Sequence, residues 1–269
     1  MERDCPLTLI EYIPDLLGQA HGFSCLLFGT DGLPVERCGA TWLYTTVLGD
    51  NGWESWVRPF DLSTLQAGTP QRVLQPDADE DSAVLQHVLA VADDFHVGIY
   101  NDGLGIAAAT ASAPQHPFVR DPGFLQRPQP GWETLGGEIA GWSLEANGNH
   151  VLIDETSDTL AFWQGYDSYR ASDFSGDLGW LRIQVDKNNR TVQAGERHAG
   201  NPLPFRRPEW SCARCGGQLA SNVRVRGKRA YFYFMRPSMT QALIGVSLSD
   251  DPLFLEGVEH HVLGTTLGE

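Results

Sequence analysis

The sequence predicts an α+β fold that is strand-rich, with antiparallel hairpins and a few helices in the N-terminal half. Three observations support this prediction: apolar residues recur at helical spacing in two early segments, hairpin patterns fill the second half, and 42% of the 269 residues are hydrophobic. That apolar share suffices for a core, which excludes a wholly disordered chain. No apolar run approaches the ~20 residues that a bilayer-spanning helix needs.

Two helices are predicted in the N-terminal half. In residues 81–95, apolar side chains recur at helical spacing, as at Val84, Val88 and Phe95. Four acidic residues lie at the start of this segment, where the helix dipole favours negative charge. Residues 7–20 are also apolar at helical spacing but contain Pro14, so we expect two short helices or one that begins near Pro14.

Strands are predicted where β-branched and aromatic residues cluster between turn signals. Residues 41–48 form such a segment, and Gly49-Asp-Asn-Gly52 follows it as a turn. Three hairpins are predicted in the second half. They pair 142–145 with 151–153 across the Asn-Gly signal at 147–148, 180–185 with the residues up to 192, and 222–226 with 229–234.

Proline placement divides the chain near its middle. Five prolines lie between Pro114 and Pro130, and because proline removes a backbone donor, residues 114–130 are predicted to be a loop or linker. It separates an N-terminal α+β region, 1–113, from a β-rich region, 131–269, that holds a Cys-x-x-Cys turn. The alternative is that both regions form one continuous domain.

Charge is distributed unevenly along the chain. The formal net charge is −15, yet residues 182–236 contain twelve bases and three acids, so this stretch carries +9 and the remainder −24. In one interpretation the two parts neutralise each other in the fold; in the other, each creates a field at the surface. We expect the acidic excess to face outward. A net acidic surface repels nucleic acid, which makes nucleic acid an unlikely partner.

The N-terminus and the cysteines predict a cytoplasmic protein. The first seven residues lack a basic segment followed by an apolar stretch, as a secretory signal would have. Five cysteines are an odd number, scattered through a chain that is long for a disulfide scaffold.

Cys212 and Cys215 form a Cys-x-x-Cys pair followed by glycine, a pattern typical of a zinc knuckle. A structural zinc needs four ligands, and the candidates for the remaining two are His198, His260 or His261, and Cys5 with Cys38 folded close. The competing interpretations are a tight turn with two unligated thiols and a redox pair, although the latter expects a βαβ context that the flanking residues lack. The predicted cofactor is therefore none or zinc.

Residues 154–177 combine six acids with five aromatic residues. Paired carboxylates there are compatible with a glycosidase acid and base, whereas the spacing does not match a calcium loop. A solvated loop and a docking surface for a basic protein are the other interpretations. We predict the docking surface, formed by Asp154, Glu155, Asp158, Trp163, Tyr166, Asp167, Tyr169, Asp173 and Asp177.

These patterns lead to a functional hypothesis: an acidic cytoplasmic protein-binding module, similar in composition to bacterial immunity proteins. It would neutralise a basic protein, for example a toxin, by occluding it, without acting as an enzyme or binding a membrane. The sequence contains no complete catalytic or nucleotide-binding motif, so no catalytic residue is assigned. The alternatives are a hydrolase that uses carboxylates in 154–177 and a zinc-stabilised module built on Cys212 and Cys215.

Overall fold

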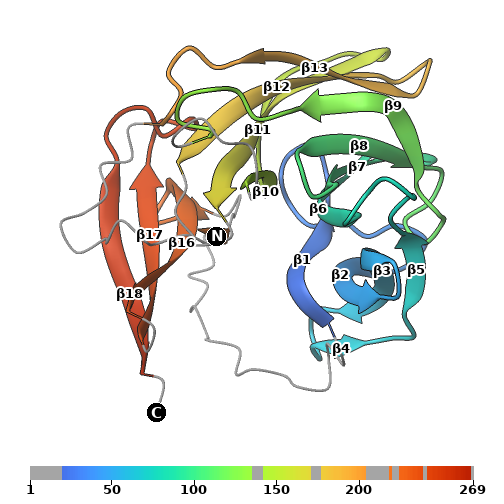
Figure 1. Cartoon of the computed structure of the whole chain (residues 1–269), viewed down its shortest axis with the longest axis horizontal. Helices are drawn as coiled ribbons and strands as arrows, with labels where there is room; N and C mark the ends of the chain where they lie inside the picture. The colour runs from blue at the N-terminus through green and yellow to red at the C-terminus, as the bar shows by residue number, and fades with distance from the viewer. Residues whose placement is uncertain are drawn as a thin grey trace.

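The computed structural model describes residues 20–134, 142–170, 177–203, 218–219, 224–238 and 241–267, and every helix or strand assigned in these ranges is a β-strand. The strands form groups that follow one another round the molecule, from β1 in blue to β18 in red (Figure 1). In the same ranges, no helix is long and apolar enough to cross a membrane.

Two groups of strands make up a nine-stranded sheet. Neighbours within each group run antiparallel, whereas β1 and β6 run parallel where Leu27 lies opposite Val88 and Phe28 opposite Leu89. The first group contains β1 (Ala20–Phe28), β2 (Thr41–Gly49), β3 (Gly52–Asp61), β4 (Gln66–Ala67) and β5 (Gln71–Leu74). The second contains β6 (Val84–Ala92), β7 (Phe95–Asn101), β8 (Ile106–Ala111) and β9 (Val119–Gln126).

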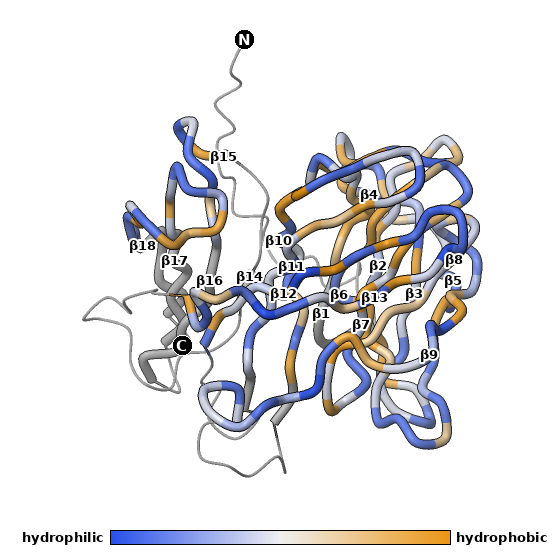
Figure 2. The backbone as a smooth tube through the Cα atoms, turned by 90° about the horizontal axis from the view of Figure 1, so that it is seen from above, coloured by the Kyte–Doolittle hydropathy of each residue, from blue (hydrophilic) through white to orange (hydrophobic). Residues whose placement is uncertain are grey.

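Two further sheets are antiparallel throughout. The third group contains β10 (Trp142–Glu155), β11 (Thr159–Arg170), β12 (Leu178–Asp186) and β13 (Thr191–Arg197). The fourth contains β14 (Gln218–Leu219), β15 (Arg224–Val225), β16 (Lys228–Ser238), β17 (Gln241–Ser249) and β18 (Glu259–Leu267). The tight turn between β15 and β16 is hydrophilic (Figure 2).

Successive groups pack on one another through a separate hydrophobic core at each interface. Leu27, Tyr44 and Leu85 belong to the core between the first and second groups. The second and third groups enclose a core that includes Ile99, Leu144 and Phe162. The third and fourth groups enclose another core, which includes Trp180, Tyr231 and Phe254. Antiparallel groups of about four strands stacked in this way are the blades of a β-propeller.

The predicted α+β class is wrong, because the described chain is all-β. The segment predicted as a helix, 81–95, contains β6, a turn at Asp93 and Asp94, and the start of β7. Every residue from 84 to 91 is buried, so the segment is an apolar run that fits a strand covered on both faces as well as a helix. The helix predicted at 7–20 lies outside the described residues, except for Ala20, which begins β1.

Most of the strand predictions are confirmed. The segment 41–48 is β2, and the hairpins of β12 with β13 and of β15 with β16 form as expected. The hairpin at Asn147-Gly148 is wrong, because β10 continues through it with an irregular register between Ala146 and His150. An Asn-Gly pair here marks a bulge rather than a turn. The predicted loop 114–130 contains β9.

Two stacked histidines lie inside the molecule where β6 and β10 meet. The ring centroids of His87 and His150 are 5.0 Å apart, and Nδ1 of His150 is 3.2 Å from Nε2 of His87. The Gln164 amide nitrogen donates to backbone carbonyls, so its Oε1, 2.6 Å from Nδ1 of His87, accepts a proton from that nitrogen. Burial lowers the pKa of His87 to about 3 and that of His150 to about 4.

The substitution His150→Gln is expected to remove part of the pH dependence of stability. A pKa of about 4 in the folded state, against about 6.5 in the unfolded chain, means that the wild-type protein loses stability as the pH falls from about 6.5 towards 4. The part due to His150 is about 2 kcal/mol between neutral pH and about pH 5. The unfolding free energy of the variant, relative to wild type, should rise by that amount over the same interval.

Urea unfolding at the two pH values measures this difference. His116→Gln, at an exposed position, is the matched control and should follow the wild type. Parallel pH dependences for His150→Gln and wild type would show that His150 does not titrate as described.

Candidate functional site

One buried acidic side chain differs from all the others in its surroundings. Three of the four buried acids of the described structure lie beside an arginine, whereas Asp167 has no cation beside it. The three ion pairs are Glu54 with Arg72 at 3.2 Å, Asp102 with Arg127 at 3.2 Å and Glu133 with Arg197 at 2.7 Å. A buried charge without a partner is costly, so Asp167 needs a different explanation.

Asp167 faces a second carboxyl group. Glu145 on β10 lies directly opposite Asp167 on β11, and Cβ atoms in such positions are about 4.5–5.5 Å apart. Asp167 is 4% exposed, while Glu145 is half-buried. The two carboxyl groups therefore lie close enough to influence each other, and Glu145 is the member that reaches the solvent.

Both carboxyl groups hold protons more tightly than usual. Burial raises the pKa of Asp167 to about 7. Burial also raises the pKa of Glu145 well above its ordinary value, with the negative charge of Asp167 as a second cause. Because neighbouring carboxyl groups in a dehydrated site do not both ionise readily, the pair holds one proton near neutral pH. One member is then an acid and the other a base.

The fourth group of strands covers this pair with Tyr231 of β16, whose side chain is buried. Asn147, on the same face of β10 as Glu145, donates from Nδ2 to the Tyr231 hydroxyl at 2.9 Å. Burial, followed by the charge of Asp167, raises the pKa of the Tyr231 phenol. Tyr231 is therefore a neutral hydroxyl at the interface between the third and fourth groups.

Because Gly165 has no side chain, the amide of Asn147 has room to lie against it. A Cβ atom at Gly165 would lie 2.2 Å from Oδ1 of Asn147, which no side chain can do without displacing the amide. The strand pairing thus depends on a residue without a side chain two positions before Asp167.

The residues predicted as a docking surface do not share one face. Along β11, Tyr166 packs into the core with the second group, whereas Trp163 packs against the core with the fourth group. Asp154, Glu155 and Asp158 are exposed near the β10–β11 turn, and Asp177 is half-buried just before β12. Tyr169 lies in β11, and Asp173 lies outside the described residues.

The basic stretch forms ion pairs with acids elsewhere in the chain. Its lysines and arginines contact Asp94, Glu133, Glu155 and Glu259, through Arg190, Arg197, Lys187 and Lys228 respectively. For these pairs, the acidic and basic parts of the chain therefore neutralise each other within the fold.

Two candidate histidine ligands of zinc, His198 and His260, each contact another side chain in the structure. His198 follows β13 and packs edge-on against Trp163, with ring centroids 4.8 Å apart. His260 lies in β18 and its Nδ1 is 2.8 Å from the Ser247 hydroxyl. Cys212 and Cys215 lie outside the described residues. Within the described part, no three His, Cys, Asp or Glu side chains form a group suited to a metal, and the zinc site stays a prediction.

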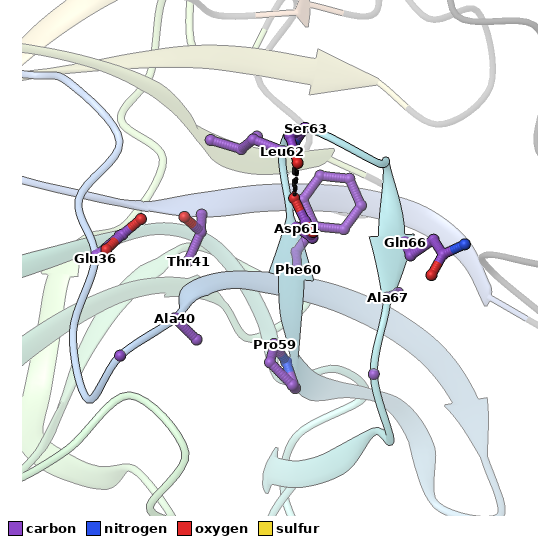
Figure 3. A pocket seen from close by; sticks show the side chains of 12 residues that line it. Glu36, Ala40, Thr41, Pro59, Phe60, Asp61, Leu62, Ser63, Gln66 and Ala67 are labelled. Carbon is purple, nitrogen blue, oxygen red and sulfur yellow. Dashed lines mark hydrogen bonds between the residues drawn. The ribbon is translucent and has the colours of Figure 1, made fainter.

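A cavity of about 630 Å³ opens beside β2, β3 and β4 (Figure 3). Its two carboxylates, Glu36 and Asp61, come from separate segments with Thr41 between them in the view. Asp61 accepts hydrogen bonds from Ser63 and Thr64 within its own turn, and these bonds lower its pKa to about 2. An ionised turn residue of this kind is not a proton donor, so the cavity offers no acid and base pair.

Comparison with known proteins gives structural similarity alone. No protein-family model matches the sequence, and no curated protein does. An α-L-arabinofuranosidase from Clostridium thermocellum is similar over 85% of this chain and 70% of its own, with 12% identity and a TM-score of 0.47. An exo-1,5-α-L-arabinanase from a bovine ruminal metagenomic library is similar over 97% and 85%, with 12% identity and a TM-score of 0.46. An endo-arabinase from Bacteroides thetaiotaomicron is similar over 83% and 76%, with 12% identity and a TM-score of 0.44.

The interpretation as an immunity-like protein-binding module is wrong. The similar solved structures named above are an arabinofuranosidase and two arabinanases, not immunity proteins. Within the molecule itself, Tyr166 and Asp167 are buried and cannot contact a partner. The predicted role in toxin neutralisation is wrong for the same reason.

The substitution Asp167→Asn is expected to change the pH dependence of stability in the opposite sense to His150→Gln. A folded-state pKa of about 7, against about 3.9 unfolded, means that the wild type loses stability as the pH rises from about 4 to 7. Asparagine cannot ionise, so the unfolding free energy of the variant, relative to wild type, should rise by about 2.5 kcal/mol between about pH 5 and pH 8.

Urea unfolding at both pH values tests this expectation. Asp154→Asn, at an exposed position, serves as the control and should show the wild-type dependence. A constant difference between Asp167→Asn and wild type across this pH range would mean that Asp167 has an ordinary pKa.

Proposed function

We propose that the chain is a hydrolase in which the carboxyl groups of Glu145 and Asp167 act as acid and base, and that its substrates are glycosides. The observation that carries this proposal is the buried Asp167 carboxyl, which faces the half-buried Glu145 and has no cation beside it among the described residues, whereas the other buried acids of the described structure each pair with an arginine. Such a pair is costly for stability, and strongly raised pKa values of this kind concentrate at functional sites.

The roles follow from exposure and charge. Glu145 reaches the solvent and its pKa is raised by burial and by Asp167, so it is the proton donor. Asp167, with a pKa of about 7, is the base. This separation of two carboxyl groups into a protonated and an ionised member is the arrangement that acid and base catalysis requires near neutral pH.

Hydrolysis of a glycosidic bond balances with these two groups alone. The protonated carboxyl group of Glu145 gives its proton to the leaving oxygen as the bond from that oxygen to the anomeric carbon breaks. A water molecule forms the new bond to that carbon, and the carboxylate of Asp167 takes its proton. The pair ends with one proton, as it began, and proton exchange between the two groups restores the starting state.

Asn147 and Tyr231 have a positioning role in this proposal. Their hydrogen bond ties β10 to β16 across the interface that contains the carboxyl pair. The hydroxyl of Tyr231 stays neutral because the pKa of the phenol is raised, and it adds no further charge beside Asp167.

Glu145→Gln and Asp167→Asn are each expected to lower kcat by at least about 100-fold, the usual range for loss of an acid or base. The substrates are 4-nitrophenyl α-L-arabinofuranoside and linear arabinan, chosen because the similar solved structures are named arabinofuranosidase and arabinanase, followed by other 4-nitrophenyl glycosides. Release of nitrophenol and of reducing sugar gives the rates.

Glu155→Gln is the matched control, since it removes an exposed acid of the same strand; it should keep the wild-type rate. Thermal unfolding of each variant verifies that the fold is retained. Activity of either carboxyl variant within threefold of wild type, or no hydrolysis of any glycoside by the wild-type protein, would refute the proposed function.

A further inference from the structure

A second cavity, of about 330 Å³, lies on the outer part of the third group of strands. It is distinct from the carboxyl pair, because Ala161 in its lining and Asp167 are six residues apart on β11, a distance of about 20 Å along a strand. Its lining consists of Asp154, Thr159, Leu160, Ala161, Arg182, Gln184, Val185, Asp186, Thr191 and Gln193.

The strand register explains the shape of this cavity. One row across all four strands of the sheet places Asp154 opposite Ala161, Ala161 opposite Gln184, and Gln184 opposite Gln193. Facing residues of neighbouring strands project to the same side of the sheet. The small side chain of Ala161 therefore forms the floor of a depression between an acidic side chain on one side and two amides on the other.

The next row supplies a cation and an aromatic ring. Trp163, half-buried and two residues along β11 on the same face as Ala161, lies opposite Arg182. The stem of Arg182 crosses Gly195, where an added Cβ would lie 3.1 Å from Cβ and Cγ of the arginine. Nε of Arg182 is buried and has no hydrogen-bond partner in the described structure. The half-buried Arg182 thus lines the cavity with its side chain, while its Nε is enclosed within the protein.

Some polar side chains of this cavity are hydrogen-bonded within the protein, and others are exposed to solvent. The Asp186 carboxylate accepts three hydrogen bonds from Asn188 and Asn189 in the β12–β13 turn. Asp154, Gln184 and Gln193 are exposed. The cavity thus offers a carboxylate that accepts, a guanidinium that donates and two amides that do both.

We propose that this cavity binds one neutral sugar residue. Hydroxyl groups both donate and accept, so they match the mixture of Asp154, Arg182 and the two glutamines that line the depression. The lining contains two carboxylates, of Asp154 and Asp186, and one arginine; the carboxylates disfavour an anion, and the arginine disfavours a metal cation. The volume is at the lower end of the range for ligand pockets, about 300–1,000 Å³, and suits one small ring.

This binding site does not depend on the proposed function, because it uses none of the residues assigned to the reaction. Binding is best measured in the Glu145→Gln variant, in which hydrolysis of the probes is not expected. The probes are the methyl glycosides of arabinose, xylose, glucose and galactose, with glucuronate as the anionic comparison. Isothermal titration calorimetry at millimolar ligand and saturation-transfer NMR provide two independent readouts.

We expect at least one neutral methyl glycoside to bind with a millimolar dissociation constant. Ala161→Phe, which fills the floor, and Arg182→Ala, which removes the donor, should each weaken that binding at least tenfold. Gln71→Ala, at an exposed position on β5, is the matched control and should bind as the parent does. The Arg182→Ala variant also covers the case in which the larger Ala161→Phe side chain prevents folding, as judged by thermal unfolding.

Three outcomes would overturn the proposal: no binding of any neutral probe, tighter binding of glucuronate than of the neutral sugars, or equal binding by Arg182→Ala and its parent. Each is independent of whether the wild-type protein hydrolyses glycosides. Failure of this site and failure of the carboxyl pair are therefore distinguishable.

Discussion

The third group of strands is covered on both faces of its inner part, and this double coverage determines the chemistry of the molecule. Along β11, Phe162 and Tyr166 enter one core while Trp163 and Asp167 face the other side. Polar groups on such a strand lose their hydration when the strand is buried. Each must be neutral, ion-paired or hydrogen-bonded, and the altered pKa values of His87, His150 and Asp167 all have burial as their first cause.

The molecule meets this demand in two different ways. Arginines neutralise most of the buried acids of the described structure, and the neutral His87 bonds to Gln164 and to His150. At Glu145 and Asp167 a proton takes the place of the cation. A proton, unlike an arginine, can leave and return, which is why we assign the proposed acid and base chemistry to the pair that has no cation among the described residues. Stability and reactivity are set here by the same desolvation.

The sequence predicted those strands that keep one exposed face and end at a clear turn, such as β2 and the hairpins of β12–β13 and β15–β16. It failed at β6, because a strand buried on both faces is apolar at nearly every position and also satisfies helical spacing. Asp167 was among the candidate residues because it lies in the acidic stretch 154–177; Glu145 lies outside that stretch, before Asn147-Gly148, which resembles a turn. The usable signal is the alternation of Leu144 and Ala146 with Glu145 and Asn147, which continues the strand and places Glu145 beside Asp167.

The parallel contact between β1 and β6 is short, with two registered residue pairs, Leu27 with Val88 and Phe28 with Leu89. Within each group, by contrast, antiparallel ladders extend over most of each strand. A unit joined to its neighbour by so few backbone bonds, and otherwise by side-chain packing, is modular. Gene duplication or recombination that inserts or removes such a unit breaks little main-chain structure, which offers a route by which architectures of this kind diversify while each sheet stays intact.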